Sequence, residues 1–98
     1  MKATVVFTDD FRSDLRSQTR RLLAEEKREW AERLIGEIEL VARVLERSPK
    51  AGLVELRRGG REIRRLLLRR LPFVVWYWET QGRRVVVLRL FHVRQQRT

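Results

Sequence analysis

A strand–turn–strand pattern in the last third of the chain restricts the fold more than any other feature. Two segments rich in valine, leucine and aromatic residues, Phe73 to Glu79 and Arg84 to Phe91, flank the short connection Thr80-Gln81-Gly82-Arg83. β-Branched and aromatic residues favour strands, and a short glycine-containing connection between two such runs is typical of a β-hairpin. The sequence therefore predicts an antiparallel hairpin over residues 73–91.

The N-terminal half predicts a strand followed by two helices. Ala3 to Phe7 is a short apolar run, after which Thr8, Asp9 and Asp10 supply side chains that can cap a helix. Apolar residues then recur at helical spacing from Asp9 to about Glu26. A second helical stripe, which ends before Ser48-Pro49 and Gly52, consists of Trp30, Leu34, Ile38, Val41 and Leu45.

The connection between these two helices contains neither proline nor glycine. It runs through Glu25, Glu26, Lys27 and Arg28, so a single long, bent helix is an alternative to a helical hairpin. Neither helix is long enough to be stable by itself, and packing both stripes on a sheet would bury them in one core. The hairpin is the preferred interpretation.

The segment Glu62 to Leu71 is compatible with two kinds of structure. Ile63, Leu66, Leu67 and Leu71 lie at helical spacing, and arginine and leucine are good helix formers. Alternation instead places Ile63, Arg65 and Leu67 on one face of a strand. Local propensity alone favours a helix.

Length and charge limit the size of the protein and the nature of its partners. The 98 residues are sufficient for one compact domain, which we expect to span residues 1–98. The formal net charge is +10, and most of the cations are arginines. Such a surplus favours an anionic partner, although a surface that is charged only for solubility is the alternative.

Several classes of site are excluded or disfavoured by composition. The chain has no cysteine, which rules out disulfides, cysteine-based zinc sites and a thiol nucleophile. One histidine and dispersed carboxylates do not make a metal-ligand cluster, and we expect no cofactor. The chain starts without a charged leader, and no apolar run reaches the length of a membrane span. We therefore expect a cytoplasmic protein that does not bind a membrane.

The order of these elements and the sequence of the last strand resemble the RelE/ParE superfamily, the toxins of type II toxin–antitoxin systems. The stretch from Val85 to Arg94, an apolar strand that closes on His92, looks like the last strand of that family. The segments 61–64 and 73–77 resemble its two preceding strands, and Pro49 to Glu55 resembles its loop after the second helix.

The resemblance implies an α+β fold of the order β-α-α-β-β-β. In that fold, two helices pack on one face of a mainly antiparallel sheet. The segment Glu62 to Leu68 would then be a strand, against its local propensity.

Two activities are associated with the superfamily. The ParE branch is described as poisoning DNA gyrase, whereas the RelE and YoeB branch cleaves mRNA on the ribosome, and an antitoxin neutralises both. Cleavage through the 2′-hydroxyl needs a base, cationic stabilisation of the phosphorane and an acid. The resemblance assigns these roles of base and acid to Glu55 and His92.

Two departures from the nuclease pattern favour the ParE branch. Val74 replaces a phosphate-stabilising arginine, and Val93 replaces a terminal aromatic residue. We therefore expect a ParE-like toxin that binds gyrase or its DNA complex. The alternatives are a ribosome-dependent mRNA endoribonuclease, and an inactive homologue or basic nucleic-acid-binding domain.

A dense group of arginines supplies most of the candidate binding residues. Between Arg57 and Arg70 seven arginines are crowded together with almost no acid nearby, which favours an anionic partner over a solvated surface. Candidate residues for binding nucleic acid or the target are Arg57, Arg58, Arg61, Arg64, Arg65, Tyr77, Arg89 and Arg94.

The predicted strand 73–79 also limits where partners bind. Trp76 and Trp78 share one face, which we expect to pack against the helices, so that Tyr77 points toward the partner side. The resemblance implies an acidic antitoxin as partner, together with gyrase or the ribosome and its mRNA. An unpaired edge strand could in addition support a homodimer.

Overall fold

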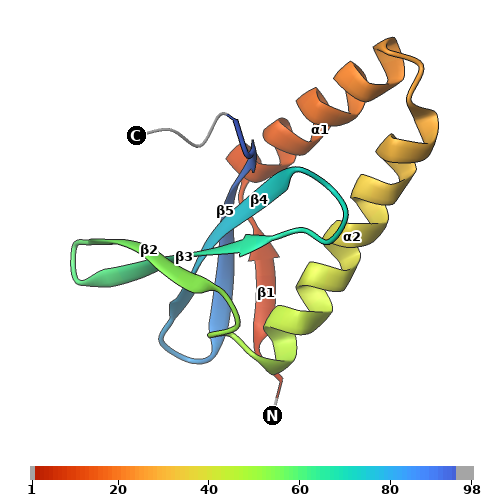
Figure 1. Ribbon diagram of the computed structural model, residues 1–98. Coiled ribbons are helices and arrows are strands. Elements are labelled where there is room, and N and C mark those ends of the chain that lie inside the picture. Colours follow the sequence, from red (N-terminus) through yellow and green to blue (C-terminus); the bar gives the residue numbers. More distant parts are fainter. Residues whose placement is uncertain (1, 95–98) are drawn as a thin grey trace.

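The computed structural model of the protein describes residues 2–94 and contains two helices and five strands (Figure 1). Residues 1 and 95–98, the two ends of the predicted domain 1–98, lie outside the described part of the chain. The elements in chain order are β1 (Thr4–Phe7), α1 (Asp9–Ala24), α2 (Arg28–Arg47), β2 (Leu53–Arg58), β3 (Arg61–Leu67), β4 (Phe73–Thr80) and β5 (Arg84–His92).

The five strands form one sheet with the order β1-β5-β4-β3-β2. β1 runs parallel to β5, and the other neighbours are antiparallel. Both helices lie on the same side of the sheet, whereas the β2–β3 hairpin extends away from them (Figure 1). We call the side of the sheet that faces the helices the covered face and the opposite side the open face. The predicted arrangement, two helices on one face of a mainly antiparallel sheet, is confirmed.

The helices form a hairpin, as expected, and the chain reverses between them without glycine. Thr8 caps α1, because its hydroxyl oxygen accepts a 3.0 Å hydrogen bond from the backbone N–H of Phe11. After α1, Glu26 adopts a positive φ of 59°, a left-handed conformation that ends a helix. The alternative of one long helix is therefore wrong. Neither of the two described helices is long and apolar enough to span a membrane.

The core lies between the helices and the covered face. The second helix contributes four of the five predicted stripe residues, Leu34, Ile38, Val41 and Leu45, whereas Trp30 is 46% exposed and lies outside the core. Residues of β4 and β5 that alternate along their strands complete the core, namely Phe73, Val75, Tyr77, Val85, Val87 and Leu90. Burial of this continuous apolar surface accounts for the stability of helices that would be marginal alone.

The ambiguous segment is a strand, and local propensity predicted it wrongly. β3 pairs with β4 from Arg64 opposite Tyr77 to Leu67 opposite Val74. This pairing satisfies the backbone groups of both strands and buries Ile63, which a short solvent-exposed helix could not do. The strand assignment implied by the family resemblance is correct.

One strand was not expected. Residues 49–55 resembled a loop, but β2 begins at Leu53, so the sheet has one strand more than the order β-α-α-β-β-β contains. β2 pairs with β3 through a two-residue turn at Gly59 and Gly60, whose φ values are 59° and 78°. Positive φ at both positions is typical of the type I′ turn of β-hairpins, which glycine adopts without strain.

Candidate functional site

Tyr77 is a structural residue of the core and does not face a partner. Its side chain is fully buried on the covered face, and its hydroxyl oxygen accepts a 2.7 Å hydrogen bond from the backbone N–H of Gly52. Burial raises the pKa of this phenol above its ordinary value of 10.0. The prediction that Tyr77 points toward the partner side is therefore wrong.

Arg64 belongs to the same anchor. Its guanidinium donates a 2.7 Å hydrogen bond to the backbone carbonyl of Gly52 and a second, 3.5 Å, to that of Lys50. Tyr77 binds the N–H of Gly52 and Arg64 binds its carbonyl, so the two side chains together hold the segment after α2 in place. Since most of the donors of Arg64 are used internally, its main role is to position the β2–β3 hairpin, although we expected it to bind the target.

The two tryptophans of β4 lie on the open face, contrary to the prediction that they pack against the helices. The alternation was predicted correctly, with Trp76 and Trp78 opposite Val75 and Tyr77, but the wrong set was assigned to the helices. Val75 and Tyr77 pair with Leu90 and Val87 of β5, and these two pairs together form the apolar surface under the helices. Both tryptophans are partly buried.

The arginine cluster is divided by the pleat of the β2–β3 hairpin. Arg58 and Arg61 are opposite each other beside the turn, and with Arg65 they belong to the open face. Arg57 and Arg64 lie on the other face, where both contact Glu62. Arg69 and Arg70 are in the connection between β3 and β4, and the backbone N–H of Arg69 is bonded to Glu37 of α2.

Nearby carboxylates neutralise more of this charge than the sequence suggested. Glu62 lies 2.9 Å from Arg57 and 3.3 Å from Arg64, and Glu55 lies 3.6 Å from Arg65. The hydrogen bond from Arg57 is the main cause of a pKa of Glu62 below its ordinary value of 4.5. The expectation of almost no local acid is wrong for these three arginines.

A basic hollow lies beside the β2–β3 hairpin and the β4–β5 turn. Its volume is about 840 Å³, and it is lined by Lys50, Arg57, Gly60, Arg61, Glu62, Arg64, Glu79, Thr80 and Gln81. Four cations face two carboxylates there, so the hollow has an excess of positive charge. Such a surface attracts phosphate or carboxylate groups.

The structure does not bring together the two residues that the resemblance assigned as base and acid. Glu55 is at a bulge of β2 and contacts Arg65 of the open face. His92 ends β5 opposite Phe73 of the core, and their rings meet edge-on at 5.4 Å. The strands β3 and β4 lie between them, and strand spacings and rises place the two residues on the order of 20 Å apart.

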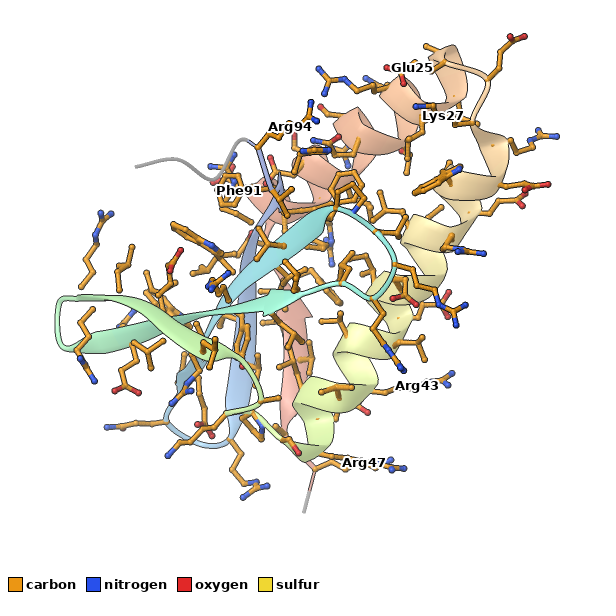
Figure 2. All side chains as sticks on the ribbon, in the orientation of Figure 1. Glu25, Lys27, Arg43, Arg47, Phe91 and Arg94 are labelled. Carbon is orange, nitrogen blue, oxygen red and sulfur yellow. The ribbon has the colours of Figure 1, made fainter. Side chains whose placement is uncertain are left out.

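His92 lies in a second hollow, on the helix side of the sheet. This hollow of about 480 Å³ is lined in part by Leu22, Trp30, Phe73 and Arg94. The Nδ1 atom of His92 accepts a 3.1 Å hydrogen bond from the backbone N–H of Arg94. Arg94 and Phe91 mark this end of β5 in Figure 2.

Arg89 is paired within the molecule. Its guanidinium makes hydrogen bonds of 2.7 and 3.0 Å to the two carboxylate oxygens of Asp14 on α1. The hydrogen bond to Asp14 raises the pKa of Arg89 above its ordinary value. Asp14 also accepts a bond from the backbone N–H of Leu90, so this pair fastens α1 to the edge of β5. A structural role accounts for these contacts of Arg89, which we expected to bind the target.

The similarity to known proteins identifies the family. The model of the ParE toxin of the type II toxin–antitoxin system parDE matches residues 5–97. The chain belongs to the ParE toxin family. This ParE-family protein matches no curated protein sequence.

Two solved structures have the same fold. The first is the chromosomal ParDE TA system from P. aeruginosa, with 18% identity, a TM-score of 0.73, and coverage of 93% of this chain and 96% of that one. The second is the toxin–antitoxin complex RelBE2 from Mycobacterium tuberculosis, with 28% identity, a TM-score of 0.58, and coverage of 94% and 99%. The RelE/ParE-like fold implied by the sequence is confirmed.

Three residues that position the site were missed by sequence reasoning. Gly52 accommodates the Tyr77 hydroxyl, Lys50 lines the basic hollow, and Asp14 holds Arg89. Only Gly52 had a signal, as a helix stop, and that signal says nothing about a contact with β4. The other two depend on tertiary contacts that no local pattern shows.

Proposed function

We propose that this ParE-family toxin acts by binding a topoisomerase, DNA gyrase or its complex with DNA, and that it does so in the cytoplasm. The observation that supports this proposal is the separation of Glu55 and His92 on opposite faces of the sheet. A base and an acid that act on one scissile phosphate must both reach it within hydrogen-bond distance. A toxin that works by binding needs no such pair.

The basic hollow is the surface that we assign to the target. Its arginines belong to the β2–β3 hairpin, the part of the molecule that extends beyond the helices (Figure 1), and Lys50 lies in the segment that leads into this hairpin. Phosphates of gyrase-bound DNA, or an acidic surface of the enzyme, would complement this charge. We further propose that an acidic antitoxin neutralises the toxin. Of the two similar structures, one is named as a ParDE TA system and the other as a toxin–antitoxin complex.

A supercoiling assay with purified gyrase tests the activity. Micromolar toxin should inhibit supercoiling. Preincubation with the antitoxin, a short acidic protein encoded by a neighbouring gene, should relieve the inhibition. The variant Arg57→Gln/Arg61→Gln should require more protein for the same effect, whereas Arg43→Gln/Arg47→Gln, on the outer side of α2, should not (Figure 2). Undiminished supercoiling at micromolar toxin would refute the proposal.

One observation favours a second activity, cleavage of ribosome-bound mRNA. Glu55 lies 3.6 Å from Arg65 on the open face, so a base and a phosphate-binding cation are adjacent there. Incubation with programmed ribosomes distinguishes the two activities. Under our proposal the mRNA stays intact. Cleavage that is lost in Glu55→Ala would support the nuclease instead.

A further inference from the structure

An exposed tryptophan lies close to the turn between the two helices. The exposed large apolar side chains of residues 2–94 are mostly on the helices, and Trp30, 46% exposed in the first turn of α2, is the one aromatic ring among them. Leaving so large an apolar ring in water is unfavourable. Single apolar residues on a surface need no explanation, but a tryptophan that lines a hollow together with other rings indicates a binding site.

Trp30 lines the hollow of about 480 Å³ that also contains His92. Phe73 and His92 bring two more rings to it from the sheet. These two rings are held in place, because they meet edge-on at 5.4 Å and the Nδ1 atom of His92 is bonded to the backbone N–H of Arg94. Pockets for small ligands typically have volumes of roughly 300–1,000 Å³. The size of the hollow and its three rings therefore suit a planar aromatic group.

The lining of this hollow is also basic. Arg21 of α1, Lys27 of the turn between the helices and Arg94 after β5 belong to it, and Figure 2 labels the last two. Glu25, the one carboxylate among the described lining residues, lies 3.2 Å from Lys27. Within residues 2–94, no carboxylate is in ion-pairing distance of Arg21 or Arg94. Two guanidinium groups thus remain for an anion, and guanidinium binds phosphate through two parallel hydrogen bonds.

We propose that this hollow binds a nucleoside phosphate, whose base stacks on Trp30 and whose phosphate pairs with Arg21 and Arg94. Gln18, buried in the wall, has an amide that can both donate to and accept from the edge of the base. The hollow is at the opposite end of β5 from the basic hollow beside the β4–β5 turn. Its occupancy is therefore independent of the proposed binding of gyrase.

The lining distinguishes a nucleoside phosphate from simpler ligands. An inorganic anion would use the guanidinium groups but leave Trp30 exposed. An uncharged ring would cover Trp30 but leave the cations without a partner. A nucleoside phosphate satisfies both, and since every base has a face that can stack, we expect little preference among bases. Both a free mononucleotide and the terminal nucleotide of a nucleic acid present this chemistry.

The indole N–H signals of ¹⁵N-labelled protein provide a direct test. The chain has three tryptophans, of which Trp30 reports on the hollow, while Trp76 and Trp78 of β4 are internal controls. Addition of AMP should move the signal of Trp30 and leave the other two in place. Adenosine and inorganic phosphate each supply one part of the ligand and should bind at least about tenfold more weakly than AMP.

Two forms of one short single-stranded DNA, with and without a 5′-phosphate, distinguish the sources of the ligand. If the site takes the end of a nucleic acid, the phosphorylated form should move the Trp30 signal at lower concentration than either AMP or the form without the phosphate. If it takes a free nucleotide, AMP should bind more tightly than both forms.

Variants test the two parts of the site by calorimetric titration with AMP. Arg21→Gln should weaken binding about tenfold, the effect of losing one charge-assisted contact. Trp30→Leu should also weaken it about tenfold, whereas Trp30→Phe keeps a ring for stacking and should stay within about threefold. Arg43→Gln removes the same charge from the outer side of α2 and should leave the affinity within about twofold (Figure 2). The ¹⁵N spectra of the variants report whether they are folded.

The proposal is overturned if neither AMP nor the phosphorylated DNA moves the Trp30 signal, or if adenosine or inorganic phosphate binds as tightly as AMP. Equal losses of affinity in Arg21→Gln and Arg43→Gln would overturn it as well, since binding would then follow the total charge. A toxin that fails to inhibit gyrase but binds AMP as expected would refute the proposed function alone. The two failures are therefore distinguishable.

Discussion

The hydrogen bond from Gly52 to Tyr77 leaves no room for a side chain at residue 52. A Cβ atom there would lie 2.4 Å from the carbonyl oxygen of Arg65 and 2.8 Å from the Tyr77 hydroxyl. In α2, by contrast, a Cβ on Gly36 would have nothing within 4 Å. The same substitution should thus have opposite effects at the two glycines.

We expect Gly52→Ala to lower the free energy of unfolding by about 2 kcal/mol or more, because the backbone must move away from β3 and break the Tyr77 bond. Gly36→Ala should raise it by about 0.5–1 kcal/mol, because alanine is the better helix former. Urea denaturation of the two variants measures both. A Gly52→Ala variant as stable as the parent would contradict the packing described for this loop.

Tyr77 also predicts a pH dependence. Its pKa is raised in the folded protein by burial, so the unfolded chain loses the phenolic proton first. The stability that this group contributes is complete below the unfolded pKa of about 10 and is lost as the pH rises through the folded pKa. Tyr77→Phe should be less stable by about 1–3 kcal/mol at neutral pH, because the Gly52 N–H loses its acceptor.

Melting temperatures of the two proteins between neutral pH and pH 11 check this. The difference between parent and Tyr77→Phe should shrink as the pH rises above about 10, because the phenylalanine variant has no phenol to ionise. If the difference in melting temperature is constant over this range, the pKa of Tyr77 is the same in the folded and the unfolded protein, and the prediction is wrong.

At the scale of elements, α1 protects one edge of β5. β1 pairs with β5 only as far as Val87, and beyond it α1 takes over the edge. The Thr8 hydroxyl donates to the carbonyl of Leu88, and Asp14 accepts the backbone N–H of Leu90. Side chains of a helix thus replace a sixth strand, which leaves this end of β5 unavailable for pairing with another chain.

The variant Asp14→Asn tests this connection. It removes the charge that pairs with Arg89, whose side chain is 45% exposed, so solvent screening limits the expected loss to about 1 kcal/mol. High salt should reduce the difference from the parent further. Glu39→Gln, a matched loss of charge on the exposed side of α2, should be close to neutral in the same urea titration.

The elements also show what the sequence could and could not predict. Strongly periodic segments, the second helix and the C-terminal hairpin, were predicted within two residues of their observed ends. β3 was predicted only through the family resemblance, because its helical propensity is overridden by pairing with β4. β2 was missed although Gly59-Gly60, between two short runs, is a known hairpin signal.

The candidate site was less predictable than the fold, because it depends on contacts between segments that are far apart in the sequence. Alternation along β4 correctly separated Tyr77 from Trp76 and Trp78, but which face the helices cover is decided by contacts far apart in the sequence. The arginines were located correctly along the chain, yet their pairing with Glu55, Glu62 and Asp14 depends on strand register and helix packing.

For the whole molecule, the important property is where the cations that produce the net charge of +10 are concentrated. The β2–β3 hairpin extends away from the helices and carries Arg57, Arg58 and Arg61 close to its turn (Figure 1). Cations on such a projection can approach a nucleic-acid backbone together, whereas those spread along α2 cannot. We expect this hairpin to dominate any binding of the toxin to duplex DNA.

The salt dependence of DNA binding measures this. On B-DNA, each neutralised phosphate contributes roughly −0.9 to the slope of log affinity against log salt, so replacing the three hairpin arginines by glutamine should reduce the slope by about 2.7. Replacing Arg33, Arg43 and Arg47 of α2 by glutamine removes the same charge. This should change the slope by less than about 0.9, the value for one neutralised phosphate. Fluorescence anisotropy of a labelled duplex over a range of salt concentrations gives both slopes. If they change equally, the protein attracts DNA through its total charge, and the hairpin has no special role in reaching a DNA-bound target.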